Sequence, residues 1–240
     1  MISLFHTVIS EPLYNGLILL MNILPFFDAG VIVIIFTIIV KIIMLPLSIK
    51  VSRAQLQMKS HEKNLSDIKE KYKDNKEEYG RKQLEYYKEK GINPFASFFI
   101  LLIQLPILIG LYNIFLKSGL PQIDMTLLYS FVSAPLTVDM VFLGLISISE
   151  KSIILAVIAG ITTYFQISLS TSQSEASSGM QGDMAKAMQV QMKYFFPILM
   201  AFIAYTISSA VALYLITSNL FAIGQEIYIK KKYHKSTMVV

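Results

Sequence analysis

A single lysine, Lys41, interrupts an apolar run of residues 29–49 that is long enough to cross a bilayer. A charge near the centre of a membrane-spanning helix costs about 2.5–3.5 kcal/mol on insertion scales, so a chain that keeps one there usually uses it. The alternative is that the flexible lysine stem carries the charge to the membrane surface. Lys41 lies eight residues from Ile49, about 12 Å at the helical rise, and the stem covers about half of that distance. We therefore favour a charge that acts inside the membrane.

The composition predicts an all-α, polytopic membrane protein. Of the 240 residues, 54% are hydrophobic, and they are grouped in long blocks. The chain has no cysteine, which excludes disulfides, thiolate catalysis and cysteine-ligated metals. The three histidines, His6, His61 and His234, lie far apart and outside the apolar blocks. Because no catalytic constellation and no glycine-rich phosphate loop is visible, we predict that the protein is not an enzyme and needs no cofactor.

The apolar blocks predict five membrane spans. We place them at residues 28–49, 95–117, 152–169, 194–208 and 209–229. The last two come from one apolar stretch that is too long for a single span, and Ser208-Ser209 is the only plausible break in it. Residues 1–27 predict an interfacial helix. Residues 118–151 predict an extracytoplasmic loop, whose apolar segment 138–148 is consistent with a position at the membrane interface. Residues 170–193 predict a cytoplasmic loop and residues 230–240 a basic cytoplasmic tail.

Residues 50–94 are of a different kind, because they hold twelve Lys or Arg and eight Asp or Glu. Apolar residues recur there at helical spacing, which favours a helical hairpin, broken near Asp74-Asn75, over a solvated linker. Positive residues mark the cytoplasmic side of membrane proteins. The hairpin and the basic tail are therefore expected inside. Residues 1–27 and 118–150 hold no Lys or Arg and are expected outside, so the N-terminus is out and the C-terminus in.

Several neutral polar residues fall in the spans near the depth of Lys41, and buried polar groups in a bilayer face the bundle or a wet cavity. Taken singly, each is explained as a link between helices, worth about 0.6 kcal/mol on average. Taken as a set, they favour a hydrated cavity. The candidate site residues are Lys41, Gln104, Thr162, Gln166, Thr217 and Asn219, with Thr163, Ser218 and Gln225 beside them. Pro46 removes one backbone hydrogen bond from the first span, which predicts a kink and water entry there.

Four motifs resemble the YidC family of membrane protein insertases. They are VKIIMLPL at residues 40–47, GINP at 91–94 followed by LIQLPI at 102–107, Pro197, and LYLITSNL at 213–220. The resemblance covers about residues 10–230, in order. It implies five core spans, a cytoplasmic hairpin, and a groove that is open to the cytosol and the lipid and closed toward the outside. The family's groove carries a cation, usually arginine, and the matching position here is Lys41.

This resemblance predicts an insertase in the plasma (inner) membrane that passes hydrophobic segments of nascent membrane proteins into the lipid bilayer. The partners that it implies are nascent membrane proteins and lipid, with the Sec translocon, the ribosome and signal recognition components as candidates. No specific nucleic-acid binding is expected. Two alternatives stay open from the residues alone. One is a small-solute transporter or channel that binds an anion at Lys41, and the other is a chaperone that holds membrane helices without inserting them.

Overall fold

The computed structural model describes residues 6–91, 107–117, 120, 122–170 and 191–233. This part is mostly helical. The α-helices are α2 (Glu11–Ile23), α3 (Ala29–Ser60), α4 (Glu62–Lys71), α5 (Lys76–Lys90), α7 (Ile153–Ser170), α9 (Phe196–Ile207) and α10 (Ser209–Tyr233). Shorter elements are the π-helical turns His6–Ser10, Asn113–Lys117 and Gln191–Phe195, the 3₁₀ turn Met125–Leu127, and the strands β1 (Val141–Phe142) and β2 (Ile146–Ser147). Residues 107–112 are also helical.

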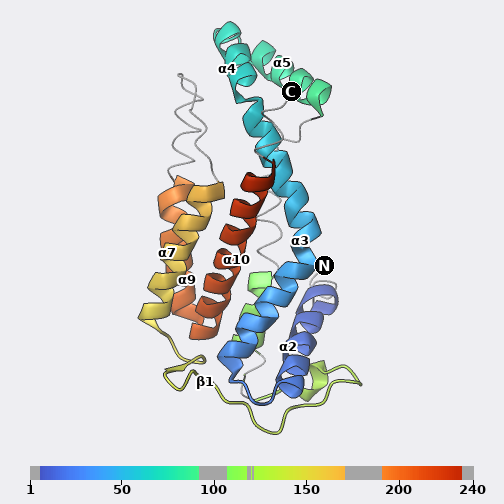
Figure 1. The fold of residues 1–240 in the computed structure, drawn as a ribbon, viewed down its shortest axis with the longest axis vertical. Coiled ribbons are helices and arrows are strands. Elements are labelled where there is room, and N and C mark those ends of the chain that lie inside the picture. Colours follow the sequence, from blue (N-terminus) through green and yellow to red (C-terminus); the bar gives the residue numbers. More distant parts are fainter. Residues whose placement is uncertain (1–5, 92–106, 118–119, 121, 171–190, 234–240) are drawn as a thin grey trace.

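The helices form an upright bundle with two different ends (Figure 1). Helices α4 and α5 lie beyond one end, at the top of the view, and we call it the α4–α5 end. The segment of residues 120–150 runs across the opposite end, at the bottom of the view, and we call it the loop end. Helices α3 and α10 both run from the loop end toward the α4–α5 end, so they are parallel neighbours.

Three described helices are long and apolar enough to cross a membrane. They contain the candidate spans Ala29–Ala54 in α3, Ile153–Ser170 in α7 and Ser209–Lys232 in α10. A fourth apolar helix, Lys193–Ile207, is shorter, and its fifteen residues measure about 22 Å, against about 30 Å of hydrocarbon. It is separated from α10 by Ser208, whose backbone is extended, within the pair where the sequence predicts a break. The predicted span 95–117 lies largely outside the described residues.

Helix α3 is one continuous helix of 32 residues that passes through Pro46 without a break. The first predicted span and the start of the predicted hairpin segment therefore belong to the same helix. The helix begins after Asp28, whose Oδ1 accepts a hydrogen bond from the Val31 amide at 2.9 Å. A carboxylate at this position satisfies a donor that the first turn leaves open. Beyond residue 49 the chain is rich in residues that favour helix, so nothing in the sequence stops α3 at the membrane surface.

Small residues let α7 and α9 approach closely. A Cβ atom added at Gly160 would lie 3.0 Å from the Ala201 Cβ and 3.3 Å from the Pro197 carbonyl oxygen. Ala156, Ala159 and Ala204 are buried on the same two helices. Close approach through small side chains is the usual way to pack helices in lipid, where the hydrophobic effect does not drive one helix against another.

Helices α4 and α5 form a small separate pair. The turn between them ends at Asn75, whose side chain accepts a hydrogen bond from the Glu78 amide at 3.1 Å and so caps α5. Tyr86 joins the two helices, since its hydroxyl lies 2.7 Å from His61 Nδ1 and accepts from Asn64 Nδ2 at 2.8 Å. Helix α5 ends at Gly91 with φ of 63°, a left-handed conformation that favours glycine.

The loop end is built around a small β-hairpin. Strands β1 and β2 pair antiparallel, with Val141 opposite Ser147 and Phe142 opposite Ile146. The Phe142 side chain packs directly on Gly30 in the first turn of α3, where an added Cβ would lie 2.5 Å from the ring and 2.8 Å from the Phe142 Cβ. Only glycine fits here without displacing the hairpin.

We therefore expect Gly30→Ala to destabilise the protein by about 1–3 kcal/mol, the usual effect of overpacking. The midpoint of thermal unfolding of the purified protein in detergent should fall. Gly224→Ala is the matched control, because Gly224 is also helical and an added Cβ there meets nothing within 4 Å. That change should leave the midpoint unchanged or raise it slightly, since alanine favours helix over glycine. Equal midpoints for the two variants would contradict the packing of Phe142 on Gly30.

Candidate functional site

Lys41 belongs to a polar face of α3. Thr37, Lys41, Ser48 and Ser52 are spaced by four, seven and four residues, which places them on one side of the helix. Thr37 and Ser52 are buried, and Lys41 and Ser48 are partly buried. The neighbours of Lys41 on the other side of the helix, Ile42 and Ile43, are 54% and 70% exposed. Lys41 therefore sits beside the surface that α3 would present to lipid, on the side that turns toward the bundle.

A hydrogen bond between α3 and α10 fixes the level of Lys41 along the neighbouring helix. The Ser48 hydroxyl lies 3.0 Å from Gln225 Oε1 and 2.6 Å from Gln225 Nε2. Because the two helices are parallel, counting back seven residues on both brings Lys41 to the level of Ser218. Ser218 is buried, and so are the adjacent Thr217 and Asn219. The polar segment of α10 thus lies at the depth of Lys41.

Asn219 links α10 to α7. Its Nδ2 donates to the Thr163 hydroxyl at 2.8 Å and lies 3.2 Å from the Thr162 hydroxyl. Each threonine hydroxyl in turn donates to the Ala159 carbonyl, at 2.7 Å from Thr163 and 3.0 Å from Thr162. Asn219 and Thr162, two of the predicted site residues, are therefore in direct contact as an interhelical clamp. Gln166 is partly buried one turn further toward the α4–α5 end of α7.

A second polar cluster lies closer to the α4–α5 end. The carboxylate of Glu226, which is buried, is hydrogen-bonded to Ser52 of α3 and lies 3.6 Å from the Lys230 ammonium. Lys230 also donates to the carbonyl of Leu169, near the end of α7. This cluster joins α3, α7 and α10 through charged and hydroxyl groups. The ends of the three candidate spans that lie nearer to α4 and α5 are thus held together by polar contacts.

The structure brings the predicted site residues together only in part. Thr162 and Asn219 are bonded to each other, Thr217 lies beside them on α10, and Lys41 lies at the same depth on α3. Gln104 falls outside the described residues. Sequence reasoning placed Gln225 in the polar set but left out its partner Ser48, and it left out Ser52 as well. Both serines could have been found from their spacing of seven and eleven residues from Lys41, which repeats one helical face.

The loop end of the bundle has a different character. Residues 29–36 of α3 and 153–161 of α7 carry only apolar side chains or glycine. Polar groups there serve to bind the loop. Asn15 of α2 donates to the Leu127 carbonyl at 2.8 Å and accepts from the Tyr129 amide at 2.7 Å. The Ala29 amide donates to the Asp139 carbonyl at 2.7 Å, and the Ser209 amide to the Glu150 carbonyl at 2.8 Å. The loop is therefore tied to α2, α3 and α10.

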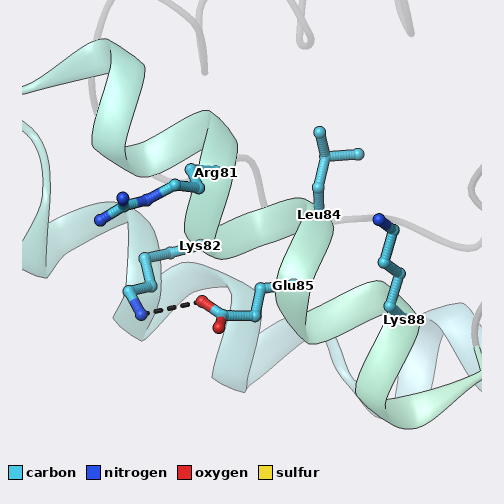
Figure 2. Close-up of a pocket in the computed structure, with 5 residues that line it drawn as sticks. All are labelled: Arg81, Lys82, Leu84, Glu85 and Lys88. Atoms are coloured by element: carbon cyan, nitrogen blue, oxygen red, sulfur yellow. Dashed lines mark hydrogen bonds and ion pairs between the residues drawn. The ribbon is translucent and has the colours of Figure 1, made fainter.

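A shallow hollow on α5 is lined by Arg81, Lys82, Leu84, Glu85 and Lys88 (Figure 2). Lys82 and Glu85 form an ion pair at 2.8 Å, and this hydrogen bond and charge hold the pKa of Glu85 below its usual value and raise that of Lys82. The residues that line this hollow provide no arrangement of an acid, a base and a nucleophile. Leu84 is one of the apolar residues that recur at helical spacing in residues 50–94, and its side chain is exposed.

Comparison with known proteins places the chain in a family. The family model described as 60Kd inner membrane protein matches residues 20–236. A protein of Fusobacterium nucleatum subsp. nucleatum named membrane protein insertase YidC is 32% identical over 85% of this chain and 86% of its own length. A protein of the same name from Clostridium tetani is 32% identical over 86% of this chain and 84% of its own length.

A longer relative shows the same match over its shared part. The protein named membrane protein insertase YidC in Francisella tularensis subsp. novicida is 28% identical over 85% of this chain, which covers 33% of that relative. The match thus extends over most of the present chain in relatives of different lengths. The chain belongs to the 60Kd inner membrane protein family, together with the relatives named membrane protein insertase YidC.

Proposed function

We infer that this chain is a membrane protein insertase, which passes hydrophobic segments of nascent proteins into the lipid bilayer. The inference rests on the position of Lys41. This cation lies in the candidate span of α3, on the same helical face as Thr37 and Ser48. A cation at that depth attracts an acidic or polar tail that would otherwise enter the membrane at a high energetic cost. The names of the relatives support the same function.

The proposed topology has five spans, with the N-terminus outside and the C-terminus in the cytosol. The spans are α3, the segment 95–117, α7, the short helix that includes α9, and α10. The distribution of positive residues supports this orientation, because residues 50–94 hold twelve Lys or Arg and residues 118–150 hold none. On this assignment the α4–α5 pair is a cytoplasmic hairpin, and the loop end of the bundle faces outward.

The proposed site is a hydrated groove that opens to the cytosol and to lipid and is closed on the outside. We assign to it Lys41, Gln104, Thr162, Gln166, Thr217 and Asn219. Two features support it: the polar contacts of the three spans cluster toward the α4–α5 end, and the loop is hydrogen-bonded across the opposite end. Lys41 provides the attraction, while Thr162 and Asn219, which bind each other, hold α7 against α10.

The attraction that Lys41 can provide is comparable to the cost of moving one acidic residue into the membrane. At an effective dielectric of about 20, two opposite charges 4 Å apart attract by about 4 kcal/mol. Placing an aspartate at the centre of a membrane helix costs about 2.5–3.5 kcal/mol. Lys41 can therefore offset the entry of one acidic residue. The rest of the substrate gains about 0.8 kcal/mol for each CH₂ group transferred to lipid. Hydrophobicity drives insertion in this mechanism, and Lys41 lowers the barrier.

The substrates in this proposal are nascent membrane proteins, which reach the groove from the cytosol past α4 and α5. The exposed charges of this pair suit contacts with cytosolic components, for which the ribosome and signal recognition components are the candidates. The Sec translocon is a candidate partner within the membrane. An anion transporter would need a path open at both ends of the bundle. The hydrogen bonds of Asn15, Ala29 and Ser209 to the loop favour the insertase, because they join the loop to three helices across one end.

The role of Lys41 is tested by replacing it with Ala, Glu and Arg and measuring insertion of a single-span substrate into proteoliposomes. We expect Ala and Glu to slow insertion of a substrate with an acidic tail by about tenfold or more, since about 1.4 kcal/mol corresponds to a factor of ten. Arg should retain most of the activity because it keeps the charge.

The control for this experiment is Lys50→Ala, which removes an exposed lysine nine residues further along the same helix. It should leave insertion nearly unchanged. A substrate whose tail carries no charge should respond less to Lys41→Ala than the acidic one does. Full insertion of the acidic substrate by the Ala and Glu variants would refute the proposed role of the charge.

The same vesicles distinguish the insertase from an anion transporter. Vesicles that hold the purified protein and an entrapped anion such as chloride should retain it as well as protein-free vesicles do. Release or exchange that depends on Lys41 would favour a transporter.

Asn219 should contribute to stability rather than to substrate attraction. Asn219→Ala and Thr163→Ala each break the same hydrogen bond, so their effects on the unfolding free energy in detergent should not add. The expected coupling is about 0.6 kcal/mol and at most about 1.7 kcal/mol, as for other hydrogen bonds between membrane helices. Insertion should fall less in either variant than in Lys41→Ala. Additive effects of the two changes would show that this bond does not form.

A further inference from the structure

The β-hairpin at the loop end exposes apolar side chains from its tip. Phe142 and Ile146 turn inward and pack against the buried core. Their neighbours turn the other way: Val141 is 40% exposed, Leu143 63% and Leu145 82%. Residues 140–149 contain no charged residue. One face of the hairpin therefore packs against the protein, and its other, apolar face is not covered by any of the described residues.

The turn of this hairpin is made by an unusual residue. Leu143 has φ of 51° and Gly144 φ of 70°. Two successive left-handed residues are the requirement of the tight hairpin turn in which asparagine or aspartate followed by glycine is preferred. Leucine is disfavoured in this conformation because its Cβ approaches the next carbonyl oxygen. In water the position would thus be unfavourable twice, by its backbone conformation and by its exposed side chain. An apolar environment outside the protein removes the second disadvantage.

The hairpin tip lies at the start of a candidate membrane span. The Leu143 amide donates to Asp28 Oδ2 at 3.2 Å, and Asp28 immediately precedes the candidate span that begins at Ala29. On the other side of the hairpin, the Ile148 carbonyl accepts from the Ala210 amide at 3.0 Å, in the first turn of α10. The tip is thus anchored between the ends of two candidate spans.

The backbone of the tip is prepared for an environment without water. The Val141 amide donates to Asp139 Oδ1 at 2.9 Å, and the Leu143 amide to Asp28. The Gly144 and Leu145 amides donate to the carbonyls of Val141 and Phe142 at 3.2 and 3.0 Å. The four amide donors are all satisfied within the protein. Open backbone polar groups usually keep a loop out of the hydrocarbon region, and these four donors do not add to that cost.

We propose that the side chains of Val141, Leu143 and Leu145 insert into the lipid leaflet at the loop end and anchor the loop to the membrane. The partner is the apolar part of the phospholipid leaflet just below the headgroups. The two carboxylates, Asp28 and Asp139, stay at headgroup level and hold the hairpin in place through its backbone. The inference depends only on the position of the hairpin at the ends of the spans and is independent of the insertase mechanism.

The test uses single-cysteine variants, which the chain allows because it has no cysteine of its own. Leu143→Cys and Leu145→Cys are each labelled with bimane and reconstituted as full-length protein into vesicles of phosphatidylethanolamine and phosphatidylglycerol. Ile154→Cys, on the exposed side of α7, reports contact with lipid, and Asp74→Cys, between α4 and α5, reports water. Emission is measured with acyl chains that carry bromine and, separately, with iodide on both sides of the membrane.

We expect the labels at positions 143 and 145 to lose emission with brominated chains, as the label at 154 does, and to resist iodide. Quenching by iodide alone, as at position 74, would place the tip in water and overturn the proposal. Protection from both quenchers would mean that protein covers the tip, which would also overturn it.

A second variant tests Leu143 without straining the turn. Leu143→Asn suits the left-handed conformation, so the fold should persist with an unchanged or higher midpoint of thermal unfolding. The label at position 145 should then lose part of its quenching by brominated chains and become more accessible to iodide. Unchanged quenching at position 145 would show that Leu143 is no part of an anchor. Because Lys41 is untouched, insertion by the Lys41 variants tests the proposed function separately.

Discussion

Polar groups inside a membrane bundle must find their partners within the protein, and in this chain the partners are distributed unequally along the bundle. At the loop end, side chains satisfy backbone groups: Asn15 binds the loop at Leu127 and Tyr129, and Asp28 binds both the first turn of α3 and the turn of the hairpin. Without these contacts the segment 120–150 would carry open backbone donors and could not lie across the ends of the helices. The fold at this end depends on a few well-placed amides and carboxylates as much as on its apolar core.

Toward the α4–α5 end the same requirement is met by contacts between side chains of different helices. Ser48 with Gln225, Ser52 with Glu226, and Asn219 with Thr163 each join two spans. Such contacts hold helices together through polar side chains, of which Ser52, Thr163, Asn219 and Glu226 are buried. The difference between the two ends supports a protein that works from one side of the membrane. Lys41 lies among these contacts, at the level of Ser218, rather than among the apolar residues of the loop end.

The positions of the long apolar helices could be predicted from the sequence, because they depend on composition along the chain. Apolar length predicted the three candidate membrane helices in the described part of the chain, and the pair Ser208-Ser209 predicted the break between α9 and α10. The limits of α3 were predicted less well, because the end of an apolar run marks the membrane surface and not the end of a helix. The β-hairpin was missed since its turn uses Leu143 where the usual signal would be asparagine. Partnerships such as Ser48 with Gln225, 177 residues apart, depend on how helices pack, which one sequence does not reveal.

The continuity of α3 has a mechanical consequence. Its 32 residues measure about 48 Å, so the helix extends well past a hydrocarbon layer of about 30 Å and carries α4 at its far end. No loop separates the exposed pair from the segment in the membrane, so α3 acts as a lever between them. Bending is easiest at Pro46, where the helix lacks a backbone donor, and this pivot lies five residues from Lys41. A force on α4 and α5 therefore bends α3 close to the partly buried Lys41. Docking at α4 and α5 and the position of that charge are thus coupled through one continuous helix.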